Sequence, residues 1–126
     1  MTTTSVSFDF RKSVAYDDGR KREFHRLARR QLGFLAKALD LPPGSFDLRS
    51  NMAGIAVSGE ITLHAEHIYV QASQPFAGFD TGILIRTCKG RKDYTGGPNN
   101  FASLDLLHDR AKLARMVRLV LERDRP

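Results

Sequence analysis

Cysteine is nearly absent from this 126-residue sequence, since Cys88 is the only one. A single cysteine excludes an internal disulfide, and it fits a reducing compartment. Apolar runs are also short, and none approaches the roughly 18 residues that a membrane span requires. The N-terminal stretch MTTTSVSFDF has neither a basic start nor a long apolar core, so no signal peptide is predicted. We therefore expect a cytoplasmic protein with no membrane partner.

Motifs of catalysis and cofactor binding are missing as well. The sequence has no G-x-S-x-G nucleophile turn and no G-x-x-x-x-G-K-[ST] phosphate-binding loop. Cys88 could act as a nucleophile if Arg86, Lys89 and Arg91 lay close enough to lower the pKa of its thiol. A lone cysteine at the end of a strand is more often a small core residue, and we expect that role. The sequence therefore favours a protein that is not an enzyme and needs no cofactor.

Positive charge is abundant and concentrated. Twenty Lys and Arg stand against fourteen Asp and Glu, which gives a net charge of +6. Seventeen of the twenty cations lie in three clusters, at 20–37, 86–92 and 110–125. Such clustering indicates an anionic partner, although the exposed faces of helices are often basic without one.

Two amphipathic helices are predicted. The first spans 17–41, with Asp17 or Asp18 as its N-cap and Pro42-Pro43-Gly44 at its end. Its predicted apolar stripe consists of Phe24, Leu27, Ala28, Gln31, Leu35, Ala38 and Leu39. A short helix over 101–107 would begin at Asn99 or Asn100, and Asp109 would cap the last helix, which runs to about Arg123.

Residues 53–88 alternate apolar and polar side chains, which predicts strands with one buried face. The expected turns are Ser58-Gly59-Glu60 and Ala65-Glu66, followed by a longer connection over 75–81 and a strand over 82–88. The expected pairs across the two turns are Val57 with Ile61, Ile55 with Leu63, His64 with His67, and Leu63 with Ile68.

The predicted fold is α+β in a single domain over 1–126. A four-stranded antiparallel meander must bury its apolar face, so the long N-terminal helix and the C-terminal helices should pack on that face. Residues 1–12 are expected to be frayed or to form a short edge strand. The opposite face of the sheet would then be polar and open to solvent.

That polar face should carry a cluster of ring side chains. His64 and His67 are expected to be cross-strand neighbours, with Tyr69 beside them. Two histidines are too few for a metal site, so no metal is predicted. Aromatic side chains on a sheet can also stack nucleic-acid bases, which keeps these three residues as a candidate site.

The most unusual stretch is RTCKGRKDYTGGPNN, residues 86–100. Its glycine pair would let backbone amides approach an anion, and its charged side chains could hold phosphates. An ordinary solvated loop is the alternative. The candidate anion-binding residues of this loop are Arg86, Lys89, Arg91, Lys92, Tyr94, Asn99 and Asn100. The candidates on the first helix are Arg22, Arg26, Arg29 and Arg30.

The first functional hypothesis is a small basic accessory protein that binds DNA or RNA through phosphate contacts of the 86–100 loop and the helix cations. A second is an adaptor or inhibitor that docks on an acidic protein. A third is an enzyme acting on an anionic substrate. The composition does not separate these hypotheses, and it leaves a homodimer open.

Overall fold

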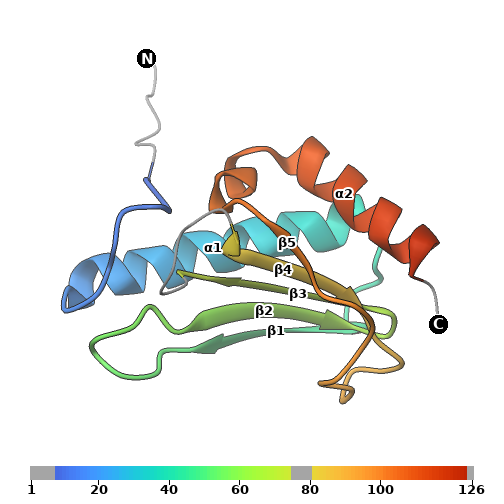
Figure 1. Cartoon of the computed structure of the whole chain (residues 1–126), viewed down its shortest axis with the longest axis horizontal. Coiled ribbons are helices and arrows are strands. Elements are labelled where there is room, and N and C mark those ends of the chain that lie inside the picture. The colour runs from blue at the N-terminus through green and yellow to red at the C-terminus, as the bar shows by residue number, and fades with distance from the viewer. Residues whose placement is uncertain (1–7, 75–80, 125–126) are drawn as a thin grey trace.

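The computed structural model describes residues 8–74 and 81–124, and within them the chain has an α+β fold (Figure 1). Five strands form one antiparallel sheet in the order β1-β2-β3-β4-β5. The strands are β1 (Phe46–Asn51), β2 (Glu60–Ala65), β3 (Ile68–Ser73), β4 (Ile83–Thr87) and β5 (Asn100–Ala102). The helices are α1 (Asp18–Ala38), a short 3₁₀ helix η2 (Leu104–His108) and α2 (Arg110–Arg123).

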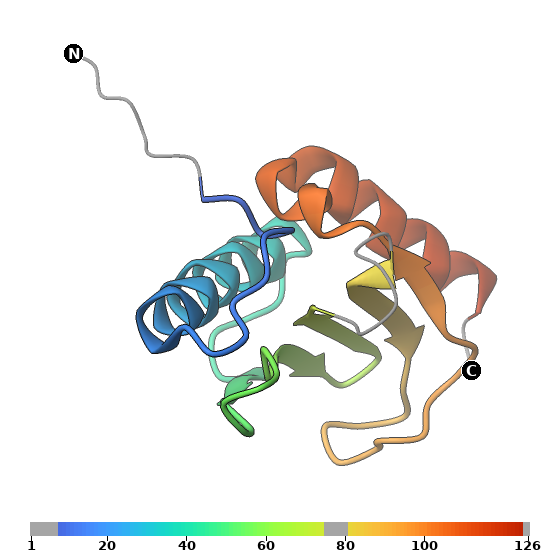
Figure 2. The same ribbon diagram turned by 60° about the vertical axis from the view of Figure 1, so that its left-hand side comes forward.

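Both α-helices cover the same face of the sheet, as predicted (Figures 1 and 2). Helix α1 begins where expected, because the Asp17 side chain accepts a hydrogen bond from the Arg20 amide. Phe24 and Leu35 are buried, but so are Leu32 and Ala36, which the predicted stripe omitted. Helix α1 is therefore rotated slightly from the predicted orientation.

The four-strand prediction was wrong at both edges of the sheet. Strand β1 alternates the half-buried Phe46 and Leu48 with charged residues, so its apolar signal is weak. Strand β5 has only three residues, and it lies where the short helix over 101–107 was expected. That helix is η2, which starts later because Ser103 caps it, and Asp109 then caps α2 as predicted.

The predicted hairpin at Ser58-Gly59-Glu60 was also wrong, because residues 52–59 form the β1–β2 connection. Ile55 and Val57 are 65% and 45% exposed, so their alternation does not mark a strand. Two buried side chains of α1 hold this connection. Lys21 Nζ donates to the Gly54 carbonyl at 2.7 Å, and His25 Nε2 donates to the Ser58 carbonyl at 2.7 Å.

The β2–β3 hairpin is present with its register moved by two residues. Leu63 pairs with Val70 and His64 pairs with Tyr69, so the turn is at Glu66 and His67. A shift of two residues keeps every side chain on its predicted face, because side chains alternate with period two. The apolar core of these strands is accordingly as predicted, with Ile61, Leu63, Ile68 and Val70 all buried.

Residues 8–12 form no strand, and the rest of the predicted N-terminal edge strand lies outside the described residues. Most of the predicted connection over 75–81 also lies outside them. Within 8–74 and 81–124, no helix is both long enough and apolar enough to cross a membrane.

Candidate nucleic-acid interface

Positive charge is segregated onto the helix layer. Helix α1 holds seven of the Lys and Arg residues and two acids, and α2 holds five cations and one acid. The two helices together carry a net +9, so the rest of the sequence carries a net −3. Two of the three cationic clusters of the sequence therefore share one layer of the fold.

The two helices join into one basic surface around Phe34, a half-buried residue of α1. The Arg110 guanidinium of α2 stacks over the Phe34 ring, 3.6 Å from its centre. Arg30 and Lys37 of α1 approach the same ring at 5.7 and 5.9 Å. Arg118 of α2 donates to the Ala38 carbonyl at the end of α1. The helix-to-helix junction is therefore lined by cations from both elements.

We call eight of the exposed cations of this layer the basic helix face. Its members are Arg22, Arg26, Arg29, Arg30, Lys37, Arg110, Arg115 and Arg118, and all are exposed. Arg22 pairs with Asp18, and Arg26 pairs with Glu23. In the part of the chain that the structure describes, the other six have no carboxylate within 4.0 Å. These six charges are therefore available to an external anion.

The 88–99 loop does not project from the fold. It returns across the side of the sheet that faces away from the helices (Figure 2). Arg91 pairs with Asp47 of β1 at 2.7 Å and donates to the Gly44 carbonyl at 2.9 Å. Arg86 is only 5% exposed, and its guanidinium lies 4.0 Å from the centre of the Tyr69 ring. Both arginines therefore make internal contacts, unlike the exposed cations of the helices.

The backbone amides of this loop already bind an anion of the protein itself. The Asp93 carboxylate accepts hydrogen bonds from the amides of Lys89, Thr95 and Gly96, at 2.9 to 3.2 Å. These bonds hold the pKa of Asp93 well below its usual range. Gly96 has φ +50°, and a Cβ there would overlap the Thr87 carbonyl oxygen. The glycine is therefore required for packing on β4, and these amides are not open to a phosphate.

The remaining loop candidates divide between surface and internal positions. Lys89, Lys92 and Asn99 are exposed, and Tyr94 is 61% exposed. Asn100 belongs to β5, where its side chain donates to the Asp124 carboxylate at 3.1 Å and to the Ile85 carbonyl at 3.2 Å.

His64 is buried, and its side chain links the sheet to the 88–99 loop by a hydrogen bond. It does not pair with His67. Arg49 donates to its Nδ1 at 2.9 Å, so Nδ1 carries no proton, and its Nε2 donates to the Gly90 carbonyl at 2.9 Å. Its ring packs against Tyr69 and Tyr94, with centroids 5.0 and 5.2 Å away. Burial lowers the pKa of His64, and the nearby Arg49 and Arg86 lower it further. The histidine is therefore held in its neutral form.

The expected histidine pair is absent because the pairing register is shifted by two residues from the predicted one. His67 lies in the exposed β2–β3 turn, and Tyr69 is the cross-strand neighbour of His64. Tyr69 is only 8% exposed, since Arg86 stacks on its ring, so the Tyr69 ring is not open to a base. Among residues 8–74 and 81–124, no group of three or more His, Cys, Asp or Glu side chains could hold a metal ion.

Cys88 is a packed residue at the end of β4. It is 1% exposed, and its Sγ donates to the Ala65 carbonyl at 3.2 Å. Burial raises the pKa of the thiol, which disfavours the thiolate that nucleophilic attack requires. The nearby Arg86 favours the thiolate but does not overcome this effect of burial on the pKa.

Comparisons with protein-family models, curated proteins and solved structures gave no match. The basic helix face is therefore the feature from which function is inferred. The sequence already indicated most of this face, because the 110–125 cluster of cations can be read from it. Only the fold brings Arg110 of α2 to the same Phe34 ring as Arg30 and Lys37 of α1, and Arg118 to the end of α1.

Proposed function

We propose that this protein binds nucleic acid by contacts between the basic helix face and backbone phosphates. The observation that carries the proposal is the set of six exposed cations without carboxylate partners in the described chain, spread over two adjacent helices. Arginine and lysine on such a surface neutralise phosphates and release condensed counterions, which is a large source of affinity for nucleic acid. Contacts of this kind position a protein without reading base sequence.

The internal bonds favour the helices over the loop as the contact surface. Arg30 and Lys37 need to break no ion pair with a described residue before they meet a phosphate. Arg91 would have to leave Asp47, and Arg86 would have to leave its buried place over Tyr69. Removing these two arginines from their internal partners costs free energy, whereas bringing an exposed, unpaired cation to a phosphate costs little.

The test compares two variants that each remove two positive charges. Arg30→Gln/Lys37→Gln changes the basic helix face, and Lys89→Gln/Lys92→Gln changes the 88–99 loop. All four residues are cations without an ion pair in the described chain, so both variants should fold normally. Binding to fluorescent duplex DNA, duplex RNA and single strands would be measured over a range of salt concentrations.

The logarithm of the wild-type binding constant should fall linearly with the logarithm of salt concentration, by about 0.9 per phosphate neutralised on duplex DNA. The helix variant should bind every probe more weakly, and its slope should shrink by up to about 1.8. The loop variant should keep the wild-type slope. A loss of affinity confined to the loop variant would show that the interface is the 88–99 loop instead. If no probe binds with a salt dependence, the proposal is wrong, and an acidic protein becomes the better candidate partner.

A further inference from the structure

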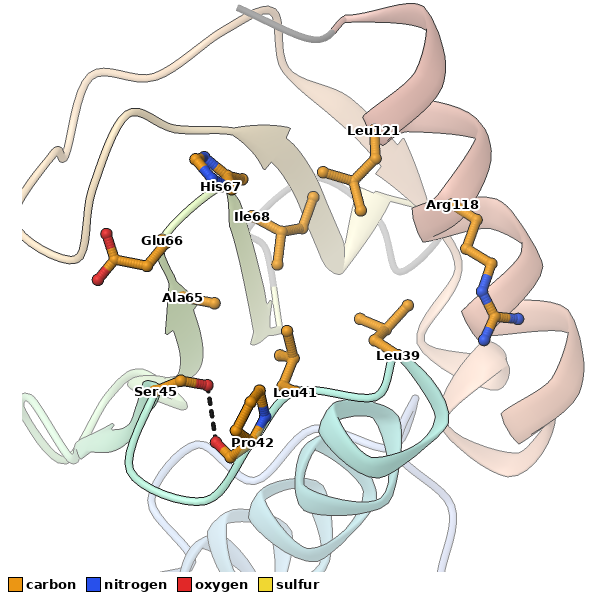
Figure 3. A pocket seen from close by; sticks show the side chains of 10 residues that line it. All are labelled: Leu39, Leu41, Pro42, Ser45, Ala65, Glu66, His67, Ile68, Arg118 and Leu121. Carbon is orange, nitrogen blue, oxygen red and sulfur yellow. Dashed lines mark hydrogen bonds between the residues drawn. The ribbon is translucent and has the colours of Figure 1, made fainter.

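A cavity of about 730 Å³ opens where α1 ends, between the Leu39–Ser45 segment, the β2–β3 turn and α2 (Figure 3). Its volume lies in the range typical of small-molecule sites. Six of its lining residues are apolar: Leu39, Leu41, Pro42, Ala65, Ile68 and Leu121. The polar lining residues are Ser45, Glu66, His67 and Arg118.

The local sequence explains why this space is not filled. Asp40 adopts φ +58°, and the Leu41 amide donates to the Ala36 carbonyl at 3.0 Å, which is a Schellman ending of α1. This ending turns the chain away from the helix axis, and Leu41 then lines the cavity. The short Ala65 side chain leaves room above the sheet, and Leu121 of α2 borders the opposite side (Figure 3).

The charges at the mouth of the cavity limit the chemistry of an occupant. The Arg118 guanidinium donates to the Ala38 carbonyl and has further N–H groups for a second acceptor. No carboxylate of the described chain lies within 4.0 Å of it. Glu66, which also lines the cavity, disfavours a head group with several negative charges. A ligand with an apolar chain and one negative charge fits both the further N–H groups of Arg118 and the negative charge of Glu66.

We propose that this cavity binds a single-chain aliphatic carboxylate. The hydrocarbon chain lies against Leu39, Leu41, Ile68 and Leu121, and the carboxylate accepts hydrogen bonds from Arg118. The site shares Arg118 with the basic helix face but differs from it in its apolar lining, and it does not depend on nucleic-acid binding.

The test measures binding of fatty acids of increasing chain length to the 126-residue protein, without nucleic acid. Octanoate, decanoate and dodecanoate would be titrated by calorimetry below the concentrations at which they form micelles. Each added methylene should tighten binding roughly fourfold, because burying one CH₂ contributes about 0.8 kcal/mol of transfer free energy. The alcohol with the same chain should bind about tenfold more weakly, because it lacks the charge-assisted bond to Arg118.

Two variants on α2 locate the head group. Arg118→Gln should bind carboxylate and alcohol equally, whereas Arg115→Gln, an exposed arginine one turn earlier, should keep the wild-type preference. Equal affinity across the three chain lengths would overturn the proposal. So would a wild-type protein that does not prefer carboxylate to alcohol, or an Arg118→Gln variant that keeps the preference.

Discussion

Protonation of His64 should weaken the folded state. In the native structure, Arg49 donates to Nδ1 and the Gly90 carbonyl accepts from Nε2. A second proton would sit on Nδ1, remove the bond from Arg49 and place a positive charge beside Arg49 and Arg86. The other polar groups near the ring are Asp47, Tyr69 and Tyr94, and the one carboxylate among them is paired with Arg91. Burial and these cations together favour the neutral ring.

The sign of the effect follows from the lowered pKa. Because the pKa of His64 in the folded protein is below its ordinary value of 6.5, the unfolded chain takes up the proton first as the pH falls. The stability contributed by the neutral ring is therefore complete above pH 6.5 and declines below it. Linkage limits the slope to about 1.4 kcal/mol per pH unit for one histidine.

His25 should contribute in the same direction, because burial also lowers its pKa. The wild-type free energy of unfolding should therefore fall by up to about 2.7 kcal/mol per pH unit just below pH 6.5. Carboxylates with lowered pKa values, such as Asp93, change the free energy of unfolding only in more acidic solution. The His64→Gln variant removes one titrating ring and should lose about half of the slope.

The assay is urea unfolding of wild type and His64→Gln at intervals between pH 5 and pH 7.5, followed by circular dichroism. The difference in unfolding free energy between the two proteins should change with pH only below about 6.5. Two parallel curves over this range would refute the assignment of His64 as a buried neutral histidine.

The remaining predictions concern the core, the loop and the thiol. Leu35→Ala should lower the free energy of unfolding by about 2–5 kcal/mol in urea titrations, because Leu35 is 2% exposed; a smaller loss would mean that its site is not packed. Gly96→Ala should lower the melting temperature, since its Cβ would strain a left-handed backbone and overlap Thr87; an unchanged value would exclude that packing. Cys88 should resist a thiol reagent until the protein unfolds, and fast labelling of native protein would contradict its burial.

Local signals in the sequence predicted the elements that depend on local chemistry. Asp17 and Asp109 cap their helices as expected, because an N-cap is a contact between a side chain and a nearby amide. The core of β2 and β3 was predicted because alternation fixes the face even when the strand register is misplaced by two residues. Strand β1 was missed because an edge strand with half-buried side chains lacks a strong pattern.

The roles of the cations could not be predicted, because they depend on contacts between distant segments. Arg91 meets Asp47 across 44 positions, and Arg110 reaches Gln31 across 79. Charge along the sequence identified three clusters, of which the 86–100 loop and the first helix were predicted to contact phosphate. Only the fold shows that Arg86 is enclosed and that the two helix clusters adjoin.

The most direct test of the nucleic-acid proposal is to observe the arginine side chains during binding. In ¹⁵N NMR spectra, the Nε–H signals of Arg30, Arg110 and Arg115 should shift when short duplex DNA or RNA is added, and the shifts should reverse in high salt. The Arg91 signal should stay in place, because its guanidinium remains paired with Asp47. Shifts confined to Arg91 and the backbone of the 88–99 loop would contradict the account, as would the absence of any shift with either nucleic acid.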